Sequence, residues 1–178
     1  GLAPLTVLSC DNLPHNGEVT DKVVTQFAER VDPALGAWVR AQVKFPGTMI
    51  DRIVPATTDA DRADVAARLG LTDAWPVVAE PFLQWVIEDK FVGERPPFVR
   101  GGAQFVSDVA PYERMKLRML NGSHSMMAYL GYLAGKEFIA EVMADPHYVR
   151  FVHNAMTEDI APTLGMPVAE TNAYRDEL

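Results

Sequence analysis

Four polar side chains in one short stretch carry groups that can exchange a proton or a hydrogen bond with a substrate: Glu113, Lys116, Asn121 and His124. A lysine amine that burial keeps uncharged can accept the hydroxyl proton of an alcohol. Amide and imidazole donors can then stabilise the oxygen that is left behind. Because a secondary alcohol must lose both a hydride and this proton to become a ketone, the four residues predict alcohol oxidation or the reverse reaction.

A single helix is expected to present these groups. Pro111 suits a first helical turn, and no proline interrupts the sequence from there to residue 135. On a regular α-helix with about 100° per residue and Lys116 at zero, Glu113 lies near ~60°, His124 near ~80° and Asn121 near ~140°. Apolar or small residues recur at intervals of three and four, as in an amphipathic helix, at Met115, Met119, Leu120, Ser123, Met126, Met127, Leu130 and Leu133.

A solvated helix surface is the alternative interpretation of this stretch, with Arg114, Lys116 and Arg118 pointing into water. The pair Asn121 and Gly122 argues against it, because the two residues cost a helix interior about 1–1.5 kcal/mol relative to alanine. Their presence suggests a requirement for a small polar donor and a close backbone approach. A hairpin turn at this pair is excluded, since the flanking apolar residues have a period of 3.6 and not 2.

Several segments of the chain resemble one enzyme family. They are SCDNLPHNG at residues 9–17, FPGTMIDRIVPATT at 45–58, AEPFLQWVIEDKF at 79–91, VSDVAPYERMKLRMLNGSHS at 106–125 and the overlapping KLRMLNGSHSMMAYLGYLAG at 116–135. In content and order they resemble the long-chain mannitol dehydrogenases, a family that includes mannitol 2-dehydrogenases and fructuronate (mannonate-type) reductases. The resemblance extends over essentially the whole chain from about Thr6 onward.

The resemblance implies a metal-independent oxidoreductase that uses NAD or NADP. Such an enzyme interconverts a polyol or sugar acid, such as mannitol or mannonate, with its keto form, fructose or fructuronate, by hydride transfer. By the same resemblance Lys116 is the general base, Asn12 and Asn121 form the oxyanion hole, and His124 binds and orients the substrate oxygen. Glu113 would relay protons between the lysine and solvent.

Composition limits the classes of function. The chain has 178 residues, 48% of them hydrophobic and 22% charged, which is typical of a soluble globular protein. Its net charge of −8 argues against a nucleic-acid-binding surface. The single cysteine, Cys10, excludes an internal disulfide and favours a cytoplasmic location. No apolar run reaches the ~18 residues needed to cross a membrane.

The predicted fold is an α/β part followed by an all-helical part. Residues 1–106 are expected to form the C-terminal part of a Rossmann-type dinucleotide-binding domain, and residues 107–178 the beginning of a helical substrate or catalytic domain. No G-x-G-x-x-G or other glycine turn follows a first strand, so the phosphate-binding part of a dinucleotide fold is not in this sequence. We therefore expect an internal fragment, roughly the middle third of a longer enzyme, which is inactive by itself.

Local patterns predict the individual elements. Strands are expected at residues 5–10, 48–54, 76–79 and 82–87, although LQWVIED at 83–89 could also be helical. Helices are expected at 18–30, 33–43, 58–69, 136–144 and 147–160. Asn12 follows the first expected strand, on the edge where a doubly wound sheet binds its ligand, although an Asx turn is an alternative role. By the family resemblance, Asp51 would lie near the nicotinamide of the cofactor. Gly131 and Gly135 are expected to permit close helix packing.

Two alternatives to a dehydrogenase site are a metal site and a non-catalytic module. No metal site is expected, because the sequence has no H-E-x-x-H or C-x-x-C, and His147 and His153 do not share a helix face. A non-catalytic binding or dimerisation module, or an inactive fragment of such an enzyme, is the main alternative. It predicts open, polar surroundings for Lys116, whereas the enzyme hypothesis predicts an enclosed amine with Asn12, Asn121 and His124 converging on it.

Overall fold

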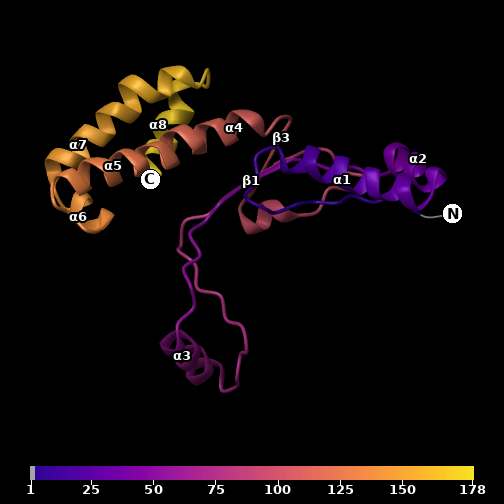
Figure 1. Cartoon of the computed structure of the whole chain (residues 1–178), viewed down its shortest axis with the longest axis horizontal. Helices are drawn as coiled ribbons and strands as arrows, with labels where there is room; N and C mark the ends of the chain where they lie inside the picture. The colour runs from indigo at the N-terminus through magenta and orange to yellow at the C-terminus, as the bar shows by residue number, and fades with distance from the viewer. Residues whose placement is uncertain (1–2) are drawn as a thin grey trace. The chain divides into compact units, whose positions relative to one another are not determined.

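The computed structural model describes residues 3–178 (Figure 1). The chain forms two compact units, the first ending at Ser107 and the second spanning Asp108–Leu178. The first unit combines helices with a small sheet, whereas every regular element of the second is helical. The residues that could do chemistry are divided between them, with Asn12 and Asp51 in the first unit and the others in the second.

Two helices at the beginning of the first unit pack against each other. α1 (Asn16–Val31) and α2 (Pro33–Gln42) are separated by Asp32, whose side chain caps α2 by accepting a hydrogen bond from the backbone N–H of Ala34 at 2.8 Å. Their buried contacts centre on Ala28, Val39, Val43 and Phe45. Both helices were expected from their apolar spacing, and both are confirmed.

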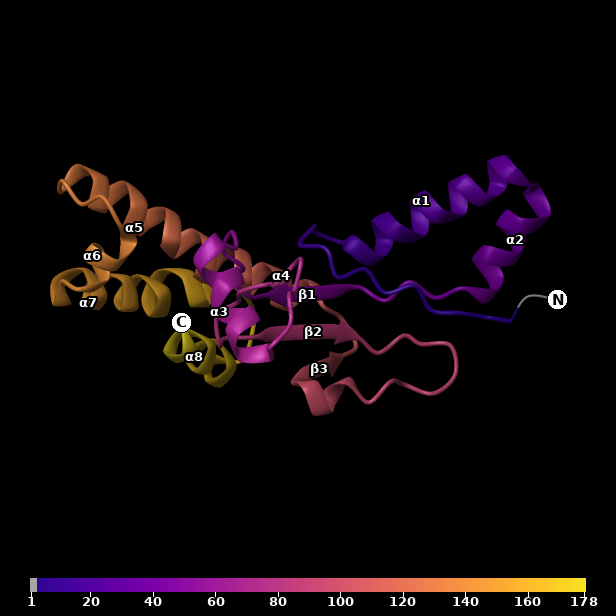
Figure 2. The same cartoon turned by 90° about the horizontal axis from the view of Figure 1, so that it is seen from below.

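The sheet has three strands in the order β1-β2-β3: β1 (Thr48–Asp51), β2 (Gln84–Glu88) and β3 (Ala103–Val106). β1 pairs with β2 in antiparallel fashion, and β2 pairs with β3 in parallel fashion (Figure 2). The central strand contributes two completely buried side chains, Val86 and Ile87, both 0% exposed. Trp85 of the same strand stacks on Phe98 of the short 3-10 helix η1 (Phe98–Gly101), with ring centroids 5.1 Å apart.

Two expected strands are absent from the described residues. In the segment 5–10, Thr6 forms an isolated parallel bridge with Lys44 and the remaining residues are irregular. Pro46 follows closely after Lys44 and has no N–H to donate, so the ladder cannot continue along the partner segment. Residues 76–79 are also irregular, and β1 ends at Asp51 and not at Val54.

β1 ends where the side chain of Arg52 begins to bond to the segment before β2. Its guanidinium donates hydrogen bonds to the carbonyl oxygens of Glu80, Pro81 and Phe82 at 2.9–3.3 Å. A longer β1/β2 ladder would direct the N–H of Ile53 at the Phe82 carbonyl, but this N–H donates to Glu80 Oε1 at 2.6 Å, so side chains replace the backbone pairing there. The chain then leaves the sheet to form α3 (Asp59–Leu69) (Figure 1). None of the residues of this helix is buried.

α3 begins and ends at the residues that the sequence predicts. Thr58 and Asp61 form a reciprocal capping box, in which the Thr58 hydroxyl accepts from the Asp61 N–H and the Asp61 carboxylate accepts from the Thr58 N–H. Hydrogen bonds from the Thr58 backbone and hydroxyl hold the pKa of Asp61 below its ordinary value. Gly70 ends the helix in the left-handed conformation, with φ of 67°.

The second unit is a bundle of short helices (Figure 2). A long helical run contains α4 (Ala110–Met115), the π-helical segment η2 (Lys116–Asn121) and α5 (Gly122–Leu133). It is followed by α6 (Ile139–Met143), α7 (Pro146–Asn154), a second π-helical segment η3 (Ala155–Ile160), the 3-10 turn η4 (Ala161–Thr163) and α8 (Val168–Glu177). α5 contacts α6 and α7, and η2 contacts η3.

The regular α-helix predicted through Lys116 and Asn121 is wrong. The helical run exists, but its middle turn is a π-turn, in which the N–H of Gly122 reaches back five residues to the carbonyl of Leu117. Arg118 ties this turn to η4 by donating from Nη1 to both the carbonyl and the hydroxyl of Thr163 at 2.9 Å. Because a π-turn is wider than an α-helical turn, it changes the angle between the side chains of Lys116 and Asn121.

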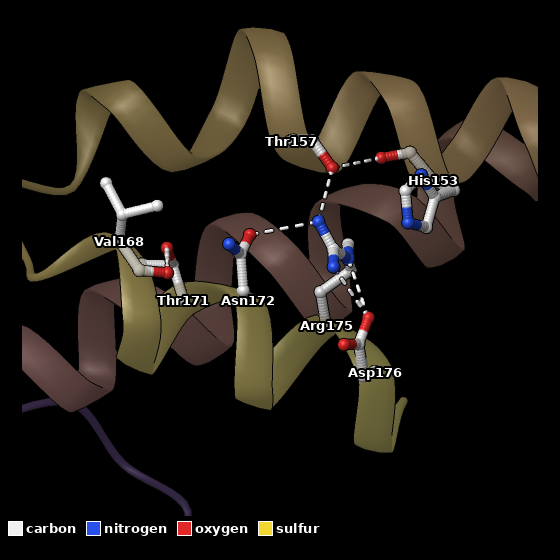
Figure 3. A network of polar contacts seen from close by, with 7 residues as sticks. All are labelled: His153, Thr157, Val168, Thr171, Asn172, Arg175 and Asp176. Atoms are coloured by element: carbon white, nitrogen blue, oxygen red, sulfur yellow. Dashed lines mark hydrogen bonds and ion pairs between the residues drawn. The ribbon is translucent and has the colours of Figure 1, made fainter.

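The second π-segment is held by Arg175 of α8 (Figure 3). Its Nη1 donates to Thr157 Oγ1 at 2.8 Å and to Asn172 Oδ1 at 2.9 Å, and the Thr157 hydroxyl donates to the carbonyl of His153 at 2.8 Å. A charged guanidinium therefore connects α8 to the irregular turn that contacts η2.

Gly131 provides the close helix packing that was expected of it. A Cβ atom at this position would lie 2.5 Å from Cγ2 of Val142, which is itself buried in α6. Gly135 instead ends the helix with φ of 75° and has nothing near its missing side chain, so the expectation of close packing there is wrong. Gly122 is equally unconfined, since its Cβ would meet only the carbonyl of Leu117 at 3.7 Å.

These contacts predict opposite effects for two alanine substitutions in α5. Gly131→Ala should lower the free energy of unfolding by about 1–3 kcal/mol, because the overpacked β-branched Val142 cannot move away easily. Gly122→Ala serves as the matched control and should raise it by about 0.5–1 kcal/mol through helix propensity alone. Thermal or denaturant unfolding of the complete protein measures both, and equal effects at the two positions would contradict the packing argument.

Candidate functional site

Lys116 is enclosed, unlike the residues that follow it. It is 8% exposed, whereas its neighbour Leu117 is 60% exposed and Arg118 also lies at the surface. Lys116 therefore belongs to the buried side of the helical run, together with Met115 and Met119, which are 2% and 0% exposed. This burial disagrees with the alternative interpretation, in which Lys116 points into water from a solvated helix face.

The π-turn places Lys116 and Asn121 on the same side of the helical run. Residues five apart lie about one turn apart in a π-helix, just as residues three or four apart do in an α-helix. Glu113 precedes Lys116 by three residues in α4, and His124 follows Asn121 by three in α5. Glu113, Lys116, Asn121 and His124 thus follow one another at intervals of about one helical turn, and this set is called the polar stripe. On a regular α-helix Asn121 would lie ~140° from Lys116, and the π-turn reduces this angle.

The polar stripe runs from a buried amine to exposed hydrogen-bonding groups. Glu113 is half-buried, and Asn121 and His124 are exposed. His124 also lies at one end of a cleft of about 240 Å³ in the second unit, whose other lining residues include Met127, Gly131, Lys136, Phe138 and Val142. A ligand that reached Lys116 along this stripe would meet an amide and an imidazole first.

Ser123 is a residue of the site region that sequence analysis treated only as part of the buried stripe. It is 0% exposed, and its Oγ has no hydrogen-bond partner among the described residues. It lies directly before His124 in α5, and it is buried where His124 is exposed. The sequence offered no signal that its hydroxyl would be buried and unpaired, because a small residue at that position satisfies the helical pattern equally well.

The first unit carries the other two expected site residues. Asn12 is exposed in the loop that joins the Thr6 bridge to α1, and Asp51 is 7% exposed at the last position of β1. One buried side chain connects their segments: Asn16 Nδ2 donates to the Asp11 carbonyl at 2.9 Å and to the Thr48 carbonyl at 3.0 Å. Burial also raises the pKa of the Cys10 thiol in the same loop.

Residues 3–178 contain neither a candidate metal cluster nor a candidate membrane-spanning helix. No group of three or more His, Cys, Asp or Glu residues between positions 3 and 178 lies in position to hold a metal ion. Within the same residues, no helix has the length and apolar character required to span a membrane.

Both units match models of one protein family. Residues 1–99 match the mannitol dehydrogenase Rossmann domain, and residues 108–178 match the mannitol dehydrogenase C-terminal domain. The expected fold class, a Rossmann-type part followed by a helical part, is thereby confirmed.

Similar proteins agree with this assignment. D-mannonate oxidoreductase of Escherichia coli (strain K12) is 51% identical over 175 residues, which cover 98% of this chain and 36% of that protein. A substrate-free crystal structure of D-sorbitol dehydrogenase has a TM-score of 0.86 at 40% identity, covering 97% of this chain and 36% of that one. Mannitol 2-dehydrogenase of Pseudomonas fluorescens, in a ternary complex with NAD and D-mannitol, has a TM-score of 0.71 at 46% identity, covering 97% and 35%. This chain thus spans about a third of the length of these relatives.

The buried hydroxyl of Ser123 gives a test of the site's packing. Ser123→Ala should raise the free energy of unfolding by about 1 kcal/mol, because it removes a buried polar atom that has no partner. Ser125→Ala is the matched control: its hydroxyl is exposed and bonds the Asn121 carbonyl at 3.0 Å, so the change should stay within about 0.5 kcal/mol. Denaturant unfolding of the complete protein measures both, and a loss of stability in Ser123→Ala would show that the hydroxyl is paired in solution.

Proposed function

Because this chain belongs to the mannitol dehydrogenase family, we propose that the complete protein is an NAD- or NADP-dependent oxidoreductase of polyols or sugar acids. It would interconvert a compound such as mannitol or mannonate with its keto form. The names of similar proteins support this substrate class, since they are a D-mannonate oxidoreductase, a D-sorbitol dehydrogenase and a mannitol 2-dehydrogenase. The activity is proposed for the complete protein and not for this chain alone.

The observation that carries the proposal is the enclosed amine of Lys116 at the head of the π-turn. A lysine on a helix surface normally keeps its ammonium group in water, because burial penalises the charged form. At 8% exposure, Lys116 departs from that pattern. Its position one π-turn before Asn121 supports a role in which the amine and the amide act on the same substrate atom.

In the oxidation direction, Lys116 would accept the proton of the substrate hydroxyl while the hydride leaves the same carbon atom. NAD or NADP, when bound, accepts that hydride. Asn121 and Asn12 would donate hydrogen bonds to the oxygen as negative charge develops on it, and His124 would fix its position. In the reverse direction the same donors polarise the carbonyl group, and Lys116 returns the proton.

Glu113 is suited to pass the proton from Lys116 to solvent. It precedes Lys116 by one helical turn, and it is half-buried where Lys116 is buried. A carboxylate between an enclosed amine and solvent can pass protons in either direction, which the lysine needs after each turnover. We therefore assign the proton relay to Glu113.

The described residues fit only part of a dinucleotide. Phosphates of such cofactors bind at a glycine turn between a strand and a helix N-terminus. In the described residues, the helix that follows the Thr6 bridge begins instead after His15, and Asn16 at its first position is engaged with Thr48. The nicotinamide end is the part that this chain would contact, with Asp51 beside it, and the phosphates require other parts of the complete protein.

A binding module remains the second candidate, because α5 exposes large apolar side chains. Tyr129, Tyr132 and Leu133 are 74%, 81% and 81% exposed, and nearby Phe138 is 63% exposed. An apolar surface of this kind fits contact with another protein segment. The two candidates differ at Lys116, since a purely structural surface gives no reason to enclose an amine.

Replacing the lysine tests the proposed chemistry. Lys116→Ala in the complete enzyme should lower kcat by about 10²–10⁴-fold at neutral pH, with partial recovery when small primary amines are added, because a general base is removed. Lys22→Ala, which removes an exposed lysine of α1, is the matched control and should leave kcat unchanged. Normal turnover by Lys116→Ala would remove the lysine from the mechanism.

A substrate panel tests the class of reaction. The complete protein should reduce NAD or NADP in the presence of at least one of mannitol, arabinitol, sorbitol and mannonate. Mannonate differs from mannitol by a carboxylate, which a cationic side chain would select. Absence of activity with all four compounds and both cofactors would contradict the proposal and favour the binding module.

A further inference from the structure

One buried amide holds the beginning of β1. Asn16 is 1% exposed; its Nδ2 donates to the Thr48 carbonyl at 3.0 Å, and its Oδ1 accepts from the Thr48 N–H at 2.9 Å. The side chain thereby occupies both backbone groups of Thr48, as a neighbouring strand would. The backbones are also close here, since a Cβ at Gly17 would lie 2.7 Å from the N atom of Gly47.

The same two residues hold the loop that carries Asn12. The hydroxyl of Thr48, 2% exposed, donates to the Ser9 carbonyl at 2.7 Å and accepts from Asn16 Nδ2 at 2.8 Å. Asn16 Nδ2 also donates to the carbonyl of Asp11 at 2.9 Å. Both carbonyls that flank Cys10 are fixed in this way, and the second of them belongs to the peptide bond that leads into Asn12.

The backbone at the far end of this loop is in an unfavourable conformation. His15 has φ of 54° and is the single non-glycine residue between positions 3 and 178 with a positive φ. Such a conformation costs free energy and persists where the surrounding structure fixes it. Asn16, the next residue, supplies the contacts that do so.

We propose that Asn16 and Thr48 are positioning residues that hold the Asn12 loop against β1, so that the Asn12 amide is fixed before substrate binds. This inference rests on the proposed function, in which Asn12 donates to the substrate oxygen. A donor of this kind must be held to within about 0.5 Å of its working position. An exposed side chain on an irregular loop cannot meet that demand unless its backbone is anchored.

The proposal predicts where a defect in this anchor appears in the kinetics. A hydrogen bond to an oxygen that becomes negative is stronger in the transition state than in the bound substrate. Loosening the loop should therefore lower kcat and leave KM nearly unchanged. A general loss of folded protein would also lower the apparent kcat at constant KM, so kcat is expressed per folded enzyme, whose concentration is measured separately.

The test uses Thr48 variants of the complete enzyme. Thr48→Val keeps the shape and the backbone pairing with Asn16 but removes the hydroxyl that holds Ser9, and it should lower kcat about 10-fold or more with KM within about 2-fold. Thr48→Ser restores the hydroxyl and should recover kcat to within about 2-fold. Thr48→Ala removes the same hydroxyl without placing a methyl group against Asn16, and it replaces Thr48→Val if that variant does not fold.

Thr25→Val is the matched control. Thr25 is also buried in the first unit, at 3% exposure, and its hydroxyl donates to Asp21 Oδ1 at 2.9 Å within α1. This variant loses a hydrogen bond of the same kind without touching the loop. It should leave kcat, KM and their ratio unchanged, whatever its effect on the unfolding temperature.

Alkylation of Cys10 reports on the loop without requiring activity. Cys10 is exposed between the two anchored carbonyls, and the cover that its thiol retains raises its pKa. A released loop should remove that cover and speed alkylation. Mass spectrometry of the peptide containing Cys10 should show labelling several-fold faster in Thr48→Val than in the wild type, and unchanged in Thr25→Val and Thr48→Ser.

The outcomes separate the two proposals. Faster labelling together with a lower kcat in Thr48→Val supports the positioning role. Faster labelling with normal kcat overturns that role while the proposed function stands, and unchanged labelling overturns the anchoring of the loop. A wild-type enzyme without dehydrogenase activity would overturn the proposed function and the catalytic part of this inference, even if the labelling result held.

Discussion

The π-turn between Lys116 and Asn121 is the constraint on which the proposed site depends. An i→i+5 turn is wider than an α-helical turn, and it is rare in proteins because its geometry is less favourable. Here Met119 and Ser123 are both 0% exposed, and the turn sets Lys116 and Asn121 about one turn apart along the helical run. The same backbone feature therefore satisfies the bundle core and sets the spacing of an amine, an amide and an imidazole.

Contacts within the second unit hold this turn in place. Arg118 binds η4 through Thr163, and the neighbouring π-segment η3 is tied to α8 through Thr157 and Arg175. The two π-segments contact each other, so an irregular turn is supported by another irregular turn. In the first unit, the Asn16 amide has a comparable role, because it replaces backbone pairing where the chain leaves regular structure. In both units, side-chain hydrogen bonds fix the segments that carry the proposed chemistry.

Sequence patterns predicted the regular elements better than the irregular ones. The capping box of α3, the break at Asp32-Pro33 and the amphipathic spacing after Pro111 are local signals, and each corresponds to a helix in the structure. The π-turn was not foreseen, because a pattern of three- and four-residue intervals is read with a fixed 3.6-residue period. The unfavourable pair Asn121 and Gly122 was the one local sign of irregularity, and it lies where the π-turn ends.

The errors in the first unit came from contacts between distant residues. Residues 5–10 have the composition of a strand, but their partner segment meets Pro46 after Lys44. The bidentate pairing of Asn16 with Thr48 joins residues that are far apart in the chain, and no spacing rule could have found it. The residues with proposed chemical roles were named from a family resemblance, whereas the residues that position them became visible only in the structure.

The central claim is that the π-turn directs Lys116 and Asn121 at one substrate oxygen. A crystal structure of the complete protein with cofactor and a polyol tests it most directly. The account predicts that Lys116 Nζ and the Asn121 side-chain amide both lie within about 2.6–3.2 Å of the same hydroxyl oxygen of the substrate. A bound polyol whose reacting hydroxyl contacts neither group, or a regular α-helix through residues 116–121, would contradict it.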